Sequence, residues 1–162
     1  MDALWYGEDT PYLYQALCNT ELYVQLPYDG YFHLRREDSL VGKSYRSYKI
    51  HSVYGARWVN ARLDKDFSSL AKLGPLHVAI NALAQMHDLF LTEKGRTQFG
   101  QEYRELLSAL RECDSLLVRQ NVAPEMYMRW LLCSRCPLLY EWMLKNRTRL
   151  KAVKHLISWV RI

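Results

Sequence analysis

The residues from Thr97 to Gln120 carry the most regular hydrophobic pattern in the chain, and they constrain its fold the most. Their apolar side chains recur in alternating steps of four and three residues, at Phe99, Tyr103, Leu106, Leu110, Cys113 and Leu117. This spacing keeps one narrow seam of a helix facing a partner helix, while the polar residues between them meet solvent. The sequence therefore predicts an α-helix over 97–120, packed either in a bundle of the same chain or against a second copy.

Length and composition indicate one globular domain. The chain has 162 residues, of which 49% are hydrophobic and 24% charged, and these values are ordinary for a protein that buries a core. Aromatic residues make up 13% of the chain, a high share that suits cores, interfaces and surfaces that stack on bases. We therefore expect a single domain over 1–162, with a β-rich part over 1–63 and a helical part over 64–162.

The first third of the chain alternates between apolar and polar residues, as β-strands do. Residues 21–26 and 31–36 flank a Pro-Tyr-Asp-Gly turn, which indicates a hairpin. Alternation returns over 45–54 and again over 57–63, beyond a glycine. The sequence thus predicts a small antiparallel β-meander over about 21–63.

The rest of the chain shows helical spacing interrupted by helix-breaking residues. The predicted helices cover about 10–18, 66–73, 75–91, 97–120, 125–135 and a last segment from Pro137 that continues or restarts near Asn146. The fold class that we infer is α+β, an N-terminal β-meander (about 21–63) followed by a C-terminal helical bundle (about 66–161).

Cysteine usage and the N-terminal residues indicate an intracellular protein, cytoplasmic or nuclear. Four cysteines in a chain of this length do not make a disulfide scaffold. No basic segment followed by an apolar run opens the chain, so no signal peptide is expected. No apolar stretch approaches the length of a membrane span.

Cys133 and Cys136 have the spacing at which two thiolates bind one zinc ion. A tetrahedral site needs two more ligands, and no second close pair exists in the sequence. Cys133 also follows an apolar run, where a buried free cysteine is ordinary. We therefore predict no metal site, although the sequence alone does not decide whether Cys133 and Cys136 bind zinc.

Two other patterns are too incomplete to indicate catalysis. The Gly42-Lys43-Ser44 tripeptide resembles the end of a phosphate-binding loop, but Glu37 stands where that loop needs glycine. One predicted helix also carries a group of polar side chains, His77, Asn81, His87 and Asp88. No nucleophile stands at a compatible spacing from them. We predict no cofactor and no enzymatic activity.

Positive charge gathers in two parts of this chain of net charge +5. After Trp142 the sequence has lysines and arginines but no acidic residue, on a predicted helix with an apolar stripe. This strip is either a solvated helix edge or a surface that tracks phosphates. Its predicted nucleic-acid contacts are Arg147, Lys151 and Lys154.

The second basic part is the predicted sheet, where cations alternate with aromatic rings. Rings beside cations are typical of sites for single-stranded RNA or DNA. The alternative is that the rings form the core while the cations line the solvent face. The candidate contacts are Arg35, Arg36, Lys43, Arg46, Tyr48, Lys49, Arg57 and Trp58.

Two functions are compatible with these patterns. The first is a non-enzymatic nucleic-acid-binding protein, with RNA favoured and little sequence specificity. The second is a protein-interaction module or a self-assembling, matrix-like structural protein, such as a viral one. It would contact anionic partners and form a homo-oligomer through the 97–120 helix. The sequence leaves RNA, protein and anionic lipid open as the partner.

Overall fold

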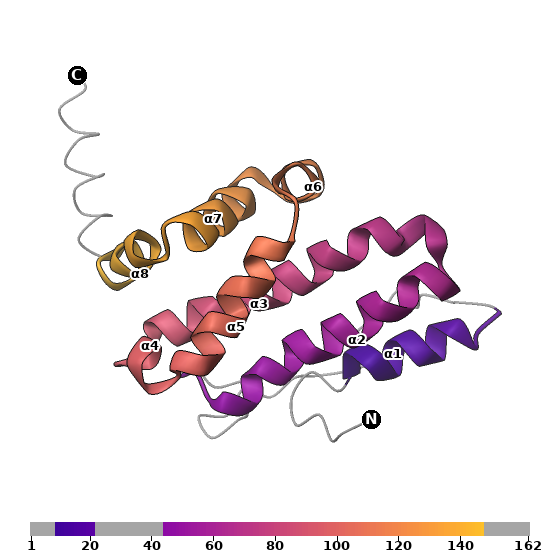
Figure 1. Ribbon diagram of the computed structural model, residues 1–162, viewed down its shortest axis with the longest axis horizontal. Helices are drawn as coiled ribbons and strands as arrows, with labels where there is room; N and C mark the ends of the chain where they lie inside the picture. Colours follow the sequence, from indigo (N-terminus) through magenta and orange to yellow (C-terminus); the bar gives the residue numbers. More distant parts are fainter. Residues whose placement is uncertain (1–8, 22–43, 148–162) are drawn as a thin grey trace, which may run out of the picture.

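The computed structural model describes residues 9–21 and 44–147, and every regular element within them is a helix (Figure 1). The 3₁₀ helices are η1 (Ser47–Ile50) and η2 (Ser68–Leu73). The α-helices are α1 (Asp9–Cys18), α2 (His51–Asp66), α3 (Gly74–Leu91), α4 (Gly95–Gln98), α5 (Gly100–Glu112), α6 (Ser115–Asn121), α7 (Pro124–Arg135) and α8 (Pro137–Lys145). None of these helices is long and apolar enough to cross a lipid bilayer.

The predicted α+β fold is wrong, because the described residues form an all-α bundle. The predicted strands 45–54 and 57–63 fall instead on η1 and α2. The buried side chains of this stretch recur at helical steps, at Lys49, Ser52, Val53, Ala56 and Val59. A short segment rich in aromatic residues is compatible with both the two-residue period of a strand and the 3.6-residue period of a helix. In 45–54 the apolar–polar alternation concealed the helical period. The predicted hairpin, 21–36, lies outside the described residues except for Glu21.

The central element of the bundle is α3, and the other helices are arranged around it (Figure 1). Helix α2 runs beside it in the opposite direction, and α1 covers the outer edge of α2. Helix α5 packs on another side of α3, and α7 and α8 contact both α3 and its neighbours. Ten of the 18 residues of α3 are buried, as expected for a helix that is enclosed on most sides.

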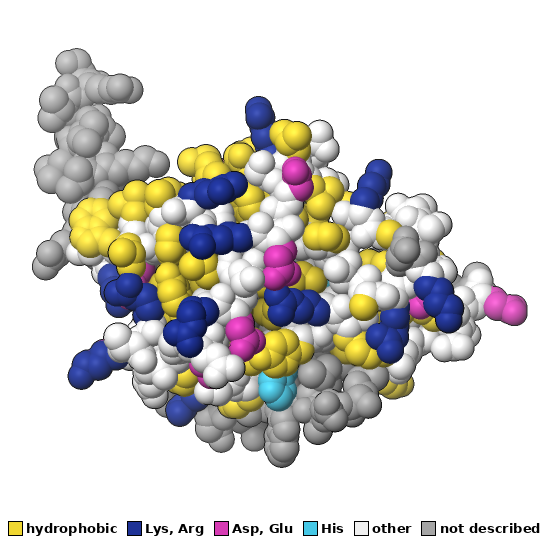
Figure 2. Space-filling view, in the orientation of Figure 1, with side chains coloured by type: hydrophobic (Ala, Val, Ile, Leu, Met, Phe, Trp, Pro, Cys, Tyr) yellow, Lys and Arg dark blue, Asp and Glu magenta, His cyan; other side chains and the backbone are white. Residues whose placement is uncertain are grey.

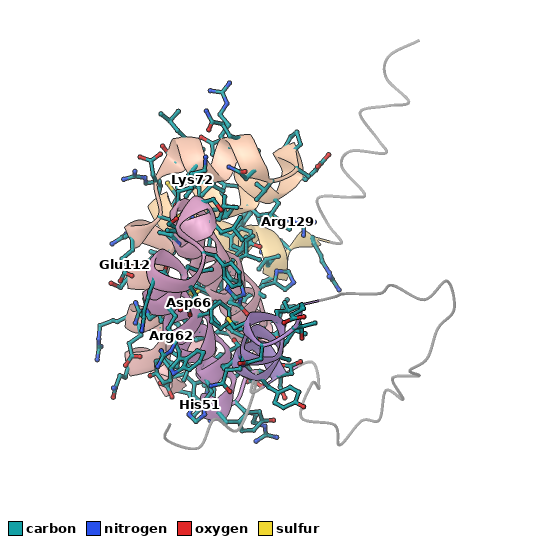
Figure 3. The ribbon with its side chains drawn as sticks, turned by 90° about the vertical axis from the view of Figure 1, so that its right-hand side faces the viewer. His51, Arg62, Asp66, Lys72, Glu112 and Arg129 are labelled. Atoms are coloured by element: carbon teal, nitrogen blue, oxygen red, sulfur yellow. The ribbon has the colours of Figure 1, made fainter. Side chains whose placement is uncertain are left out.

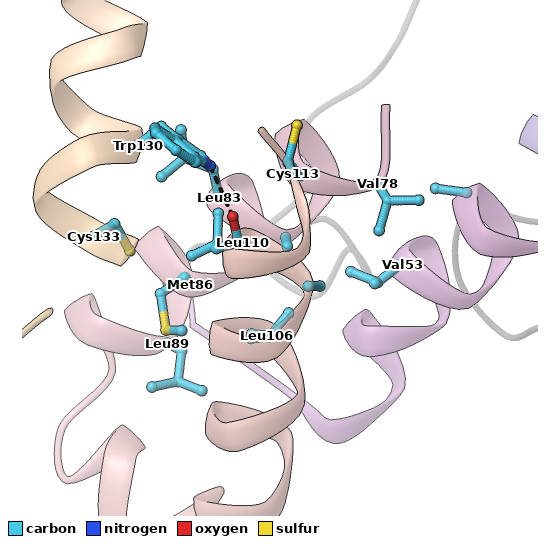
Figure 4. Close-up of a cluster of buried hydrophobic side chains, with 14 of the residues drawn as sticks. Val53, Val78, Leu83, Met86, Leu89, Leu106, Leu110, Cys113, Trp130 and Cys133 are labelled. Atoms are coloured by element: carbon cyan, nitrogen blue, oxygen red, sulfur yellow. Dashed lines mark hydrogen bonds between the residues drawn. The ribbon is translucent and has the colours of Figure 1, made fainter. Parts of the chain in front are cut away.

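The seam predicted over 97–120 faces α3 of the same chain. Leu106 and Leu110 have no exposed surface and lie in the core cluster with Leu83, Met86 and Leu89 of α3 (Figure 4). The seam is therefore used for packing inside the monomer and is not available to a second copy.

The helix itself is shorter than predicted, because the chain bends at Cys113 and Asp114. The carboxylate of Asp114 accepts hydrogen bonds from the backbone N–H groups of Leu116 (2.6 Å) and Leu117 (3.2 Å). This is an N-cap, and it starts α6 as a separate helix. The predicted helix 97–120 is thus divided into α4, α5 and α6.

A buried tryptophan joins α7 to the end of α5. The indole N–H of Trp130 donates a hydrogen bond to the backbone oxygen of Leu110 at 3.1 Å (Figure 4). The Leu110 carbonyl lies in the last turn of α5, where no further backbone N–H of the helix is available. The bond therefore satisfies both groups and sets the position of α7.

Replacing Leu110 with alanine should lower the free energy of unfolding by about 2–5 kcal/mol, because a fully buried leucine leaves a cavity. Leu116 is a matched control, since it is 61% exposed on α6, and Leu116→Ala should change stability by less than about 0.5 kcal/mol. Urea unfolding followed by circular dichroism measures both. Equal losses in the two variants would contradict the assignment of the seam to the monomer core.

Candidate functional site

A groove of about 680 Å³ lies between α7 and α8, beside α3. Proline occupies the first position of each of these helices, where its missing N–H costs no hydrogen bond. The residues that line the groove recur at helical steps on one face of each segment, at Glu125, Met128, Arg129 and Leu132 and at Tyr140, Met143, Leu144 and Arg147. The groove therefore has an apolar lining of Met and Leu and two guanidinium groups.

A hydrogen-bonded pair of rings lies at the base of this groove. Nδ1 of His87, from α3, is 3.2 Å from the hydroxyl of Tyr140, and both residues line the groove. Burial raises the pKa of Tyr140 to about 12, so its hydroxyl stays neutral. Burial lowers the pKa of His87, the neighbouring Asp88 opposes this, and Arg129 and Arg147 lower it further. Two cations thus act electrostatically on the base of the groove.

Exposed apolar side chains occur in the groove lining and elsewhere on α7 and α8. We call this region the α7–α8 surface and define it by Met126, Met128, Leu138, Leu139, Trp142 and Met143, which are all exposed. Trp142 is 54% exposed and Leu138 57%. In Figure 2 apolar and basic side chains gather side by side where Figure 1 shows these two helices. Gathered apolar groups of this kind mark interaction sites more often than single exposed ones do.

The predicted nucleic-acid contacts are only partly visible. Arg35, Arg36, Lys43, Lys151 and Lys154 lie outside the described residues. Of the others, Arg147 lines the groove and Arg46 is exposed just before η1.

Lys49 is buried, with 1% of its side chain exposed, and its Nζ lies 2.7 Å from Oδ2 of Asp88. The pair joins η1 to α3. An ammonium group enclosed in this way holds the fold together and has no open path to a phosphate. Tyr48 is half-buried and lines a shallow pocket with Tyr54 and Glu105.

Arg57 and Trp58 follow each other in α2 but engage different neighbours. Arg57 contacts both carboxylate oxygens of Glu112 in α5, at 2.9 and 3.2 Å. The Trp58 ring lies under Arg62, whose guanidinium carbon is 3.6 Å from the ring centre, and the ring of Tyr14 meets it edge-on. These residues do not form a common face of cations and open rings.

The Cys133-x-x-Cys136 pair is divided between core and surface. Cys133 is fully buried, and burial raises the pKa of its thiol to about 12. Cys136 is exposed at the start of α8. Among the described residues, no three His, Cys, Asp or Glu side chains lie together so that they could hold a metal ion.

The sequence analysis did not identify the groove, although part of its signal was present. Met128 and Leu132 are four residues apart on one helix, and Met143 and Arg147 are four apart on the next. In the sequence Arg147 belongs with the basic residues that follow it, and its proximity to Arg129 is not apparent. That proximity depends on how α7 and α8 pack, which helical spacing does not specify.

Asp88→Asn should lower the free energy of unfolding by about 2 kcal/mol or more, because it removes the carboxylate beside a buried ammonium. Lys49→Met should cost less than about 1 kcal/mol, since it keeps the length of the side chain and leaves a carboxylate that water can reach. Urea unfolding of both variants measures the difference. A larger loss for Lys49→Met would contradict this account.

Acid should weaken the fold through His87. Its pKa is lowered in the folded protein, so the unfolded chain binds a proton that the folded chain does not as pH falls below about 6.5. The free energy of unfolding therefore decreases on acidification until pH reaches the folded-state pKa. His87→Gln should reduce this acid sensitivity. The sensitivity that remains in the variant should come from His77, whose pKa is also lowered by burial. Histidine NMR titration checks it, and a His87 pKa at or above 6.5 would contradict it.

We compared the chain with protein-family models, with curated proteins and with solved structures, and none of them matches.

Proposed function

We propose that this chain is a non-enzymatic protein-interaction module, which acts inside the cell and binds its partner through the α7–α8 surface. The observation that carries the proposal is the set of exposed apolar side chains on α7 and α8, with Trp142 and Leu139 at 54% and 47% exposure. Large apolar side chains are unfavourable in water unless a partner covers them, and Trp, Met and Arg are the residues enriched in protein interfaces.

The position of α8 favours a preformed contact surface over a loose one. Glu141, which is 14% exposed, pairs with Lys145 of the same helix and with Arg96 of α4, at 2.5 and 3.4 Å. Tyr140 is buried between α8 and α3, with its ring 6.0 Å from that of Phe90. One face of α8 is thus held on the bundle, while the opposite face presents its leucines and tryptophan to a partner.

Nucleic-acid binding is the weaker candidate. Stacking needs open rings beside cations that are available to phosphate, whereas Trp58 is covered by Arg62 and Lys49 is buried beside Asp88. RNA binding through Arg147, Lys151 and Lys154 stays a prediction. Self-assembly through the 97–120 helix loses its support, since the seam is buried in the monomer.

Site-specific cross-linking in cells tests the proposal. A photoreactive amino acid in place of Leu139 should form an adduct with a partner protein, and the same group in place of Lys65, an exposed residue of α2, should not form that adduct. The adducts are identified by mass spectrometry. An adduct that nuclease removes, or the same adducts from both positions, would contradict the proposal.

A further inference from the structure

The groove between α7 and α8 has the chemistry to select among protein partners. Its apolar lining is Met128, Leu132, Met143 and Leu144. Methionine is unbranched and polarizable, so a groove lined with it adapts to different apolar side chains. The volume of about 680 Å³ suits a few anchoring side chains of a partner.

The shape of the groove favours a helix as the bound element. Two helices form its walls, and their lining residues recur every three or four positions. A third helix packs into such a groove with apolar side chains at positions i, i+4 and i+7. A peptide that binds by adding a strand would need an exposed strand edge, and no strand occurs in residues 9–21 or 44–147.

The charge of the groove favours an acidic partner. Among the described residues, neither Arg129 nor Arg147 belongs to an ion pair, whereas Arg57 and Arg96 do. Arg129 lies on the opposite side of the molecule from Glu112 (Figure 3). Both guanidinium groups lower the pKa of His87 at the base, whereas the neighbouring Asp88, which pairs with Lys49, acts on it in the opposite direction. A single carboxylate, from Glu125, lines the groove against them.

The same charge disfavours two of the occupants that the chain itself could supply. Residues 148–162 carry Arg149, Lys151, Lys154 and Arg161 and no acidic residue, so they would place cations beside cations. A second copy of a chain of net charge +5 is repelled overall.

We propose that the groove binds an amphipathic helix of a partner protein, with apolar side chains between α7 and α8 and carboxylates on Arg129 and Arg147. This inference rests on the proposed function and adds the chemistry of the partner. The carboxylates pair with the guanidinium groups, and the apolar face covers the Met and Leu lining.

A display library of helical peptides tests the selectivity. Apolar residues are kept at i, i+4 and i+7, all other positions are random, and selection uses the full-length chain. The selected peptides should be rich in Asp and Glu. Selection of basic peptides, or of none, would overturn the proposal.

Charge reversal tests the role of the two arginines. Binding of the selected acidic peptides, measured by fluorescence anisotropy, should fall by about tenfold or more in the Arg129→Glu, Arg147→Glu double variant. The Arg119→Glu, Arg135→Glu double variant is the matched control, because it changes the net charge equally at exposed positions outside the groove lining. Its affinity for the selected peptides should stay within about twofold of the wild type. Equal losses in the two double variants would overturn the proposal, and circular dichroism confirms that both fold.

Cross-linking from position 143 separates the proposal from the function on which it rests. A photoreactive group replacing Met143 should label an acidic helical segment of a partner, and Arg129→Glu, Arg147→Glu should abolish that adduct. A protein adduct that survives charge reversal would refute the acidic partner and retain the interaction module. An adduct to residues 148–162, to a second copy or to RNA would overturn this proposal, and the absence of any protein adduct from positions 139 and 143 would overturn both.

Discussion

The packing of α5 against α3 is the contact on which the rest of this bundle depends. At the centre of the apolar seam of α5, Leu106 and Leu110 are covered completely by their neighbours in the core. Burying two leucines to this degree contributes several kcal/mol, at about 1.5–3 kcal/mol for each side chain. Because α3 is enclosed on most sides, every other helix takes its position relative to this pair.

Polar contacts then determine where the outer segments lie. The buried Lys49–Asp88 pair holds η1 on α3, and the hydrogen bond from Trp130 holds α7 at the end of α5. Neither contact needs to add much net stability, since burying polar groups is costly. Their effect is on geometry, because a buried polar group has few places in which its partners are satisfied. The Trp130 contact holds α7 at the end of α5, and α7 also packs against α8 and α3, between which the groove lies.

The groove and its surroundings differ from the rest of the bundle in how their side chains are used. In the core, Leu, Met and Trp contact one another, whereas on α7 and α8 the same residue types remain open to water. Arg129 and Arg147, like several other arginines of the described residues, form no ion pair, and they lie beside the apolar lining of the groove. Apolar groups and unpaired cations therefore occur together in one region, and this combination supports recognition of a partner that is both apolar and acidic.

The sequence by itself determined the helices whose signals are local. Pro124 and Pro137 mark the beginnings of α7 and α8, and the four-three spacing over 97–120 identified Leu106 and Leu110, two of the residues that α5 buries. It misassigned 45–63, because Tyr, Val and Ile favour strands locally, and only packing against α3 shows that Lys49, Val53 and Ala56 face one direction.

Only the tertiary structure determined which charged residues are buried, which are paired and which line the groove. Whether a lysine is buried beside a carboxylate, as Lys49 is, or an arginine opens onto a groove, as Arg129 does, depends on residues distant in the sequence. Helical periodicity specifies which residues share a face of one helix, and it does not specify which helix that face will meet. The fold of α5 could therefore be predicted in part, and the groove could not.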